Sequence, residues 1–208
     1  SGTSHYLGQN FAKAFDVTFQ SETGARELVH ATSWGVSTRL LGGMIMSHSD
    51  DNGLVLPPKV APVQVIIVPI VAKTQEENDK IFSTCDAIVR ALRDAGIRVE
   101  LDARTHLRPG AKYFEWERKG VPIRLEFGPR DLTNKQATLF TRYDGAKGSI
   151  SIADLASLPN TVNAKLAEIH QALYKQAQDR THAQTAAINS YAELKQARTP
   201  FCCCRLRD

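Results

Sequence analysis

The sequence predicts an α/β fold whose best-defined part occupies residues 63–157. Residues 63–70, VQVIIVPI, form a nearly continuous β-branched run, which is typical of a strand buried on both faces. A helical pattern follows over residues 74–96, and a second strand-like run, IRVELDA, begins at Ile97. Because a strand, a helix and a strand in this order form a right-handed crossover, we expect the two strands to be parallel.

The helix between these strands is predicted by its apolar spacing and its ends. Thr74 and Glu77 have the spacing of a capping box, and Gly96 is suited to the helix C-terminus. The apolar residues that recur every three to four positions are Ile81, Cys85, Ile88 and Leu92. They predict one buried stripe along an amphipathic helix.

Further elements follow in chain order. Residues 104–120 read as a loop and a short helix. We expect strands at 121–128 and 136–144, a short strand or helix lead-in at 148–156, and a long helix at 158–184. Together with the first unit they predict a compact α/β module of ordinary domain size.

A boundary precedes this module. The stretch GLVLPPKVAP, residues 53–62, contains three prolines, and proline blocks helices and favours extended geometry in the preceding residue. The expected domains are therefore 1–57, 63–157 and 158–208, the last being a helix with a short stub.

Composition and charge restrict the function classes. Of the 208 residues, 42% are hydrophobic and 23% are charged, as in globular proteins. Neither a long apolar run nor a leader-like N-terminus is present, so we expect a cytoplasmic protein without a membrane segment. The net charge of +4 permits a polyanionic partner without requiring one. The three adjacent cysteines, Cys202 to Cys204, lack the paired spacing of zinc sites, so no metal site is expected.

Two features near the N-terminus are candidates for chemistry. Thr3 and His5 alternate, so in a strand their side chains would share a face, although ordinary surface residues show the same pattern. Arg39 precedes the apolar run LLGGMIM, which we expect to form a packed, buried helix. A helix N-terminus favours anions, so an arginine there indicates a bound phosphate or, alternatively, a salt bridge to a core carboxylate.

A third feature is the dense mixture of charges in WERKGVPIRLEFGPRD, residues 116–131. Arginine donates to guanine O6 and N7, while a carboxylate can accept hydrogen bonds from the other edge of an unpaired guanine. The alternative is a solvent-exposed edge strand held by ion pairs.

Three segments resemble the C-terminal half of prolyl-tRNA synthetase, of the type found in eukaryotes and archaea. They are GTSHYLGQNFAKAFDVTF from residue 2, TSWGVSTRLLGGMIMSHSDDNGLVLPPKVAPVQVIIVPI from residue 32, and WERKGVPIRLEFGPRD from residue 116. The resemblance implies that residues 1–57 end a class II catalytic domain with an antiparallel sheet. It also implies that residues 63–157 are an anticodon-binding domain with a mixed sheet.

The resemblance also assigns roles to single residues. Arg39 is similar to the arginine of class II motif 3, which holds the γ-phosphate of ATP. Thr3 and Ser37 match ATP-contacting positions, although the family more often has threonine in place of Ser37. The residues that match the wall of the proline pocket are His5, Trp34 and Gly35.

The implied reaction forms prolyl-adenylate from proline and ATP, with Mg²⁺ sharing the phosphate charge, and then transfers the prolyl group to tRNA(Pro). The resemblance further implies a homodimer in the full-length enzyme. Motifs 1 and 2 would lie upstream of Ser1, so we expect this chain alone not to aminoacylate. Cys202 stands where the family has a first zinc ligand, but the following residues depart from that pattern.

Glu117, Arg124 and Arg130 match the family's readers of the two guanines in the proline anticodon. Two alternatives remain at this stage. One is a non-catalytic tRNA-binding or accessory protein that kept the anticodon-binding fold. The other is a related class II synthetase for threonine, histidine or glycine.

Overall fold

The computed structural model describes residues 2–72, 74–188, 190–196 and 201–204. Its contacts divide the chain into two units, Ser1–His48 and Ser49–Asp208. In the described part of the chain, no helix is both long enough and apolar enough to cross a membrane.

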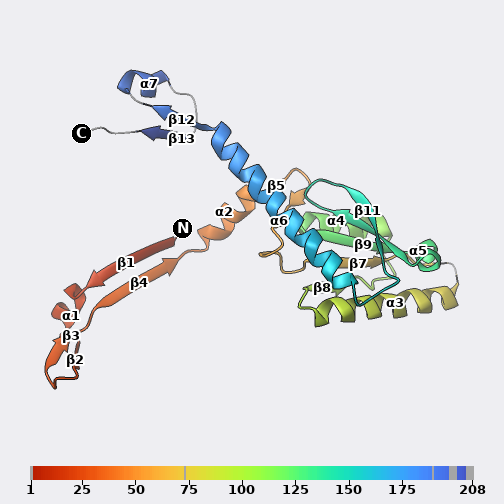
Figure 1. Ribbon diagram of the computed structural model, residues 1–208, viewed down its shortest axis with the longest axis horizontal. Coiled ribbons are helices and arrows are strands. Elements are labelled where there is room, and N and C mark those ends of the chain that lie inside the picture. Colours follow the sequence, from red (N-terminus) through yellow and green to blue (C-terminus); the bar gives the residue numbers. More distant parts are fainter. Residues whose placement is uncertain (1, 73, 189, 197–200, 205–208) are drawn as a thin grey trace. The chain divides into compact units, whose positions relative to one another are not determined.

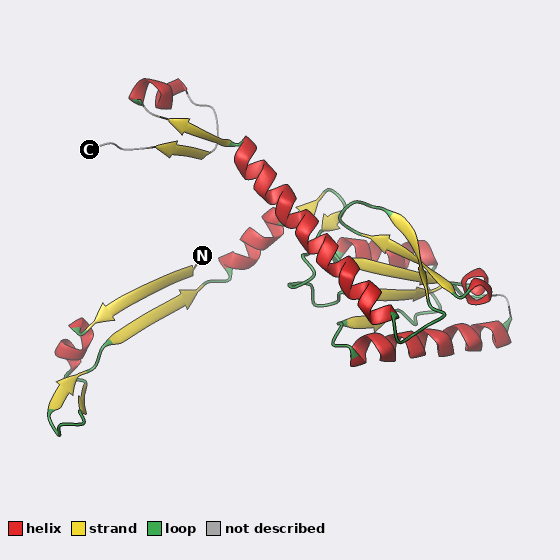
Figure 2. Ribbon diagram, viewed as in Figure 1, coloured by secondary structure: helices red, strands yellow, loops and turns green. Residues whose placement is uncertain are grey.

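The first unit is built on one long antiparallel pair of strands, β1 (Gly2–Gly8) and β4 (Ala31–Val36). Between them come α1 (Asn10–Phe15) and the small antiparallel pair β2 (Thr18–Gln20) and β3 (Arg26–Leu28). The helix α2 (Arg39–Ser47) follows β4. Figure 2 shows β1 and β4 as a two-stranded ribbon. The antiparallel pairing agrees with the expected catalytic-sheet portion.

The expectation that the apolar run after Arg39 forms a buried helix is half right. The run is helical, but no residue of α2 is buried, and Leu41 and Met46 are 59% and 80% exposed. The physical reason is that the described elements of the first unit provide no second layer for α2 to pack against. Ala12 is the only buried hydrophobic residue among those described in this unit.

The second unit contains a five-stranded mixed sheet in the order β11-β10-β9-β7-β8. The strands are β7 (Val65–Pro69), β8 (Val99–Leu101), β9 (Ile123–Phe127), β10 (Gln136–Thr141) and β11 (Lys147–Ser151). β7 is parallel to both β8 and β9, whereas β10 is antiparallel to β9 and β11. The predicted crossover unit and the α/β class are thus confirmed.

Helices cover both faces of this sheet (Figure 1). Val65 and Ile67 of β7 face α3 (Gln75–Asp94) and α6 (Leu158–Ala183) in the main core. Ile66 and Val68 point to the other face, where Tyr113 and Trp116 of α4 (Pro109–Arg118) pack. Because successive strand residues alternate, a strand covered on both faces is apolar throughout.

α3 has the predicted stripe, and all four of its predicted apolar residues are buried. Its N-terminus differs from the prediction. Thr74 is the N-cap but makes no side-chain capping bond, so the capping box is absent. The Asn78 side chain instead bonds both backbone groups of Ala72. Gly96, with φ of +78°, adopts the left-handed conformation that favours glycine after a helix.

The alternative of a solvent-exposed edge strand at 121–128 is wrong. β9 is the middle strand of the sheet, and all five of its residues are buried. A short helix that the sequence did not predict, α5 (Pro129–Asn134), follows it.

Residues around the predicted boundary belong to the second unit. β5 (Ser49–Asp50) and β6 (Gly53–Leu54) form a small antiparallel pair, and the backbone N–H of Leu56 donates to the carbonyl of Gly120. The contact division therefore falls earlier than the proline-rich stretch.

After α6 the structure has β12 (Thr185–Ile188), α7 (Tyr191–Gln196) and β13 (Phe201–Cys204), with β12 parallel to β13. The cysteine side chains of β13, on which the zinc expectation depends, lie outside the described part of the structure.

Candidate functional site

The N-terminal candidate residues meet across the β1 and β4 pair. Thr3 lies opposite Gly35, and His5 lies opposite Ser33. Residues directly opposite in an antiparallel pair point to the same face. A Cβ atom on Gly35 would stand 3.5 Å from the Thr3 hydroxyl oxygen. The structure therefore gathers Thr3, His5 and the uncovered backbone of Gly35 on one face.

Trp34 does not join them through its side chain. It pairs with Ser4, so strand alternation directs its ring to the opposite face from His5 and Gly35. The ring is 77% exposed. Of the three residues expected at the proline pocket, the structure thus brings two to one face and leaves Trp34 able to contribute only its backbone there.

Arg39 is the first residue of α2, as expected, and its side chain is exposed. The turn before it is closed by the N–H of Leu40, which donates to the carbonyl of Ser37. The N-cap, Thr38, makes no side-chain capping bond. Among the described residues no carboxylate lies within ion-pair distance of Arg39, so the salt-bridge alternative finds no partner within them. The exposed guanidinium at the helix N-terminus is therefore open to an anion.

The same face does not fit a magnesium ion. The side-chain groups of the Thr3 and His5 face are a hydroxyl and an imidazole, whereas Mg²⁺ prefers carboxylate and phosphate oxygens. Across the described residues, no group of three or more His, Cys, Asp or Glu side chains is placed to hold a metal ion.

The second candidate cluster surrounds Arg124, on the face of the sheet that α4 covers. Phe140 lies opposite Arg124 in the β9 and β10 register, and its ring centroid is 4.0 Å from the guanidinium carbon. The ring of Tyr113 from α4 is 4.2 Å from the same atom. Both rings thus stack on the cation, which holds the guanidinium plane in a fixed orientation.

The edges of this guanidinium face two carboxylates. Nη2 is 3.0 Å from Oε1 of Glu126, and Nη1 is 4.0 Å from Oε2 of Glu117. The Arg124 side chain is only 7% exposed, whereas that of Glu117 is 28% exposed. Burial first, and then the charge of Glu126, raise the pKa of Tyr113. The structure therefore brings the predicted residues Glu117 and Arg124 together, with Glu117 the more accessible of the two.

Arg130 stands apart from this pair. It is an exposed residue of α5, and within the described part of the chain no ion pair joins it to Glu117. Its helix is fixed to the end of β9 by Asp131, whose carboxylate accepts a bond from the Gly128 N–H at 2.9 Å.

Sequence reasoning missed several residues of the second cluster. Tyr113 and Phe140 come from other elements, and no local pattern links them to Arg124. Glu126 could have been found, because it lies two positions from Arg124 and so faces the same side of β9.

A buried charge network also holds α4, through Lys112 and Trp116. The Asp102 carboxylate accepts bonds from the Trp116 indole at 2.7 Å and from Arg104 at 2.6 and 2.8 Å. The buried ammonium of Lys112 donates to the Asp102 carbonyl at 3.0 Å. Burial alone would raise the pKa of the Asp102 carboxyl, but the bonds from Arg104 and Trp116 outweigh burial and hold it well below its usual range.

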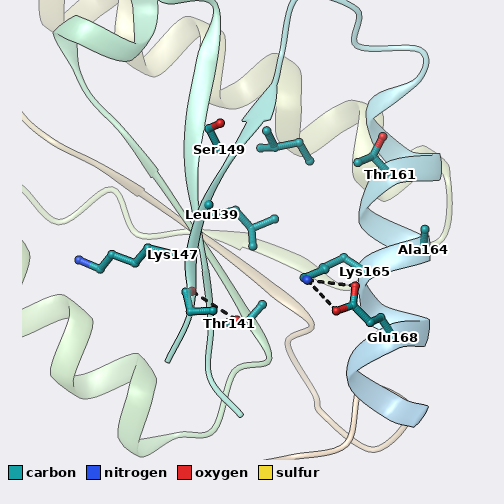
Figure 3. Close-up of a pocket in the computed structure, with 11 residues that line it drawn as sticks. Leu139, Thr141, Lys147, Ser149, Thr161, Ala164, Lys165 and Glu168 are labelled. Atoms are coloured by element: carbon teal, nitrogen blue, oxygen red, sulfur yellow. Dashed lines mark hydrogen bonds and ion pairs between the residues drawn. The ribbon is translucent and has the colours of Figure 1, made fainter. Parts of the chain in front are cut away.

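A pocket of about 410 Å³ lies between β10, β11 and α6 (Figure 3). Its lining residue Leu139 belongs to the core on the α3 and α6 face, so the pocket is on the other side of the sheet from Arg124. Lys165 in its wall bonds both carboxylate oxygens of Glu168, as the dashed lines in Figure 3 show. None of the predicted site residues lies in it.

Comparison with known proteins gives these clusters a family context. Residues 64–158 match the model of the anticodon binding domain family. A proline–tRNA ligase of Porphyromonas gingivalis is 47% identical over 196 residues, and one of Salinibacter ruber is 45% identical. Each alignment covers 94% of this chain and 39% of the relative. A crystal structure of prolyl-tRNA synthetase from Cryptosporidium parvum, complexed with L-proline and AMP, superposes with a TM-score of 0.78 at 43% identity.

Over 94% of its length this chain is therefore similar to prolyl-tRNA synthetases. The structural match covers 94% of the chain and so includes most of both units, and 41% of the C. parvum chain. The chain spans about two fifths of the length of the relatives that it matches. Since these relatives are ligases, the similarity favours the synthetase interpretation over an accessory tRNA-binding protein.

Proposed function

We propose that this chain supplies two parts of a proline–tRNA ligase: the ATP-binding C-terminal part of the catalytic domain, and the anticodon-binding domain. The longer protein would activate proline with ATP and transfer it to tRNA(Pro). The observation that supports this most strongly is a single alignment at 47% identity to a proline–tRNA ligase, which runs through both candidate clusters. We keep the domain assignment 1–57, 63–157 and 158–208 as part of the proposal.

In the first step, the proline carboxylate attacks the α-phosphate of ATP, and pyrophosphate leaves. No protein nucleophile is required, so this face acts by positioning and by charge stabilisation. Arg39 would hold a terminal phosphate with its planar guanidinium, and Thr3 and Ser37 would contact the nucleotide. The exposed guanidinium at the N-terminus of α2 supports this role.

Proline would lie against His5 and Gly35. Gly35 supports this placement because its missing side chain leaves the strand backbone accessible beside the Thr3 hydroxyl. Trp34 would then contribute through its main chain.

Anticodon reading would use the second cluster. The Glu117 carboxylate, the most accessible group beside Arg124, would accept bonds from the N1–H and N2 amino groups of an unpaired guanine. Arg124 would supply a donor edge fixed by the two aromatic rings, and Arg130 would reach a second guanine from α5. Such a mixture of acceptor and donors suits guanine better than a uniformly basic patch.

The anticodon assignment is tested by measuring dissociation constants of the 208-residue chain for two transcripts, tRNA(Pro) and the same tRNA with both anticodon guanines replaced by adenines. We expect the replacement to weaken binding at least tenfold, because each mismatched base contact costs about 1 to 3 kcal/mol. Equal affinities would remove Glu117, Arg124 and Arg130 as base readers.

Finer points of the assignment are also proposals. A cytoplasmic enzyme, a homodimer and ATP used with magnesium are proposed from the resemblance. Membership of the eukaryotic and archaeal type is supported by the 43% identity to the C. parvum protein, while the curated relatives named above are bacterial. Sedimentation of the full-length enzyme would test the dimer.

A further inference from the structure

A second buried arginine lies close to the cluster around Arg124, which we call the reading cluster. Each of its three side-chain nitrogens donates a hydrogen bond. Arg142 follows β10 and is 5% exposed. Its Nη1 and Nη2 donate to the two carboxylate oxygens of Asp50 at 2.8 and 2.5 Å. Its Nε donates to the main-chain carbonyl of Glu117 at 3.0 Å. Arg142 thus joins a segment 92 residues away in sequence to the residue expected to read guanine.

The backbone on either side of this contact is fixed as well. The N–H of Arg142 donates to the carbonyl of Pro122 at 3.0 Å. Arg142 lies two positions beyond Phe140, whose ring stacks on Arg124. The guanidinium is therefore attached to the same part of the sheet as the reading cluster, rather than to a flexible loop.

The segment that carries Asp50 also packs directly on the end of α4. Gly53, with φ of +132°, lies so close that a Cβ atom there would be 2.5 Å from the Arg118 Cα. Gly120, with φ of +73°, is equally close to Leu54. The N–H of Leu56 donates to the Gly120 carbonyl. We call residues 50–56 the strap.

Arg142 itself is not a candidate for contacting nucleic acid. Each of its three nitrogens donates to the Asp50 carboxylate or the Glu117 carbonyl, and the side chain is almost fully buried. Its effect must pass through the groups that it holds. The carbonyl of Glu117 lies in the last turn of α4 and also accepts a bond from the Gly120 N–H at 3.0 Å. Arg142 therefore adds a side-chain donor that ties this turn to the sheet at a helix end, where carbonyls lack partners within the helix.

We propose that Arg142, oriented by Asp50, is a positioning residue for guanine recognition: it fixes the last turn of α4 so that the Glu117 carboxylate stays beside Arg124. This inference rests on the proposed function, in which Glu117 reads the anticodon. We call the bonds from Arg142 to Asp50 and to the Glu117 carbonyl the clamp. Breaking the clamp lets the Glu117 carboxylate move relative to Arg124, so discrimination between bases falls more than general tRNA affinity.

The test measures a ratio of dissociation constants, that for the adenine-substituted tRNA(Pro) transcript divided by that for the natural one. We expect Arg142→Lys, which keeps the charge but cannot make the bidentate and carbonyl contacts together, to reduce this ratio roughly tenfold, the scale of one charge-assisted hydrogen bond. Asp50→Ala removes the carboxylate that orients the buried Arg142 guanidinium, and it should reduce the ratio similarly. Asp50→Glu, which retains a bidentate carboxylate, should restore most of the ratio.

Arg98→Lys is the matched control. Arg98 also joins distant backbone segments, through bonds from Nε to the Ala61 carbonyl at 2.9 Å and from Nη2 to the Pro58 carbonyl at 2.8 Å. None of these bonds involves α4, so replacing Arg98 should lower thermal stability while leaving the ratio unchanged.

The outcomes separate the two claims. If the unmodified chain does not discriminate between the transcripts, or if Glu117→Ala leaves the ratio intact, the proposed function fails. If Glu117→Ala abolishes discrimination while folded Arg142→Lys and Asp50→Ala keep the natural ratio, the positioning role is wrong and the proposed function stands. Equal weakening for both transcripts in the clamp variants would likewise overturn the positioning role.

Discussion

At the residue scale, Arg39 is exposed at the start of α2 and is free of a carboxylate partner among the described residues. A guanidinium in this state can stabilise charge that develops on ATP during adenylate formation. Removing one such preorganised donor from an active site costs about 10² to 10³ in rate.

We predict this loss for Arg39→Ala in a chimera. The chimera is the P. gingivalis ligase in which the matching 196-residue segment is replaced by this chain. The measurement is proline-dependent exchange of pyrophosphate into ATP. Arg26→Ala, an exposed arginine of β3, serves as the control and should keep the parental rate. An Arg39→Ala chimera with unimpaired exchange would remove the assigned phosphate role.

Asp102 gives a prediction about pH. Its pKa in the folded chain lies below the unfolded value of about 3.9. A depressed carboxyl pKa contributes stability that is complete above the unfolded value and is lost as the pH falls through it toward the folded pKa. The natural chain should therefore lose unfolding free energy steeply below about pH 4.

Asp102→Asn should lower the unfolding free energy at pH 7 by about 2 kcal/mol or more, because Arg104 and the buried Lys112 lose the negative charge that pairs with them. It should also make the unfolding free energy depend less on pH between about pH 4 and pH 2. Denaturant melts followed by the fluorescence of Trp116, in a Trp34→Phe background, measure both effects. Asp179→Asn, at an exposed position of α6, is the control. Identical acid slopes in the two variants would contradict the role given to Asp102.

At the element scale, the strap and α4 approach too closely for side chains. Gly53 combines a positive φ with a Cβ position that collides with the Arg118 backbone. Gly110, inside α4, has a normal φ and open space around its Cβ position. Replacing each of these two glycines with alanine, which adds one methyl group, should therefore change the unfolding free energy in opposite directions.

Gly53→Ala should lower the unfolding free energy by more than about 1 kcal/mol, because strain and collision add. Gly110→Ala should raise it by about 0.5 kcal/mol, since alanine loses less chain entropy in a helix. Urea melts of the two variants beside the natural chain measure the difference. If Gly53→Ala proves neutral, the close packing of the strap on α4 is not maintained in solution.

At the scale of the whole molecule, the sequence predicted those helices and strands whose residue pattern repeats within a single segment. The stripe from Ile81 to Leu92 and the apolar run of β7 carry their own period, so α3 and the parallel crossover could be placed without a structure. The burial of α2 was wrong because helicity is local, whereas burial depends on a second layer. The central position of β9 was missed because strand order is not written in any one segment.

The candidate sites follow the same division. The shared face of Thr3 and His5 was predictable from alternation, and so was the place of Arg39 before an apolar helix. The stacking of Tyr113 and Phe140 on Arg124 depends on the pairing of β9 with β10 and on the packing of α4. The Asp50 and Arg142 pair spans 92 residues, so no spacing rule could reveal it.

The most direct measurement of the central claim is charging of tRNA(Pro) by the unmodified chimera, with proline, threonine, histidine and glycine supplied separately. We predict ATP-dependent charging with proline alone, and its loss when both anticodon guanines are replaced. A folded chimera that charges no tRNA while the parental ligase does, or one that accepts another of these amino acids as readily as proline, would contradict the account.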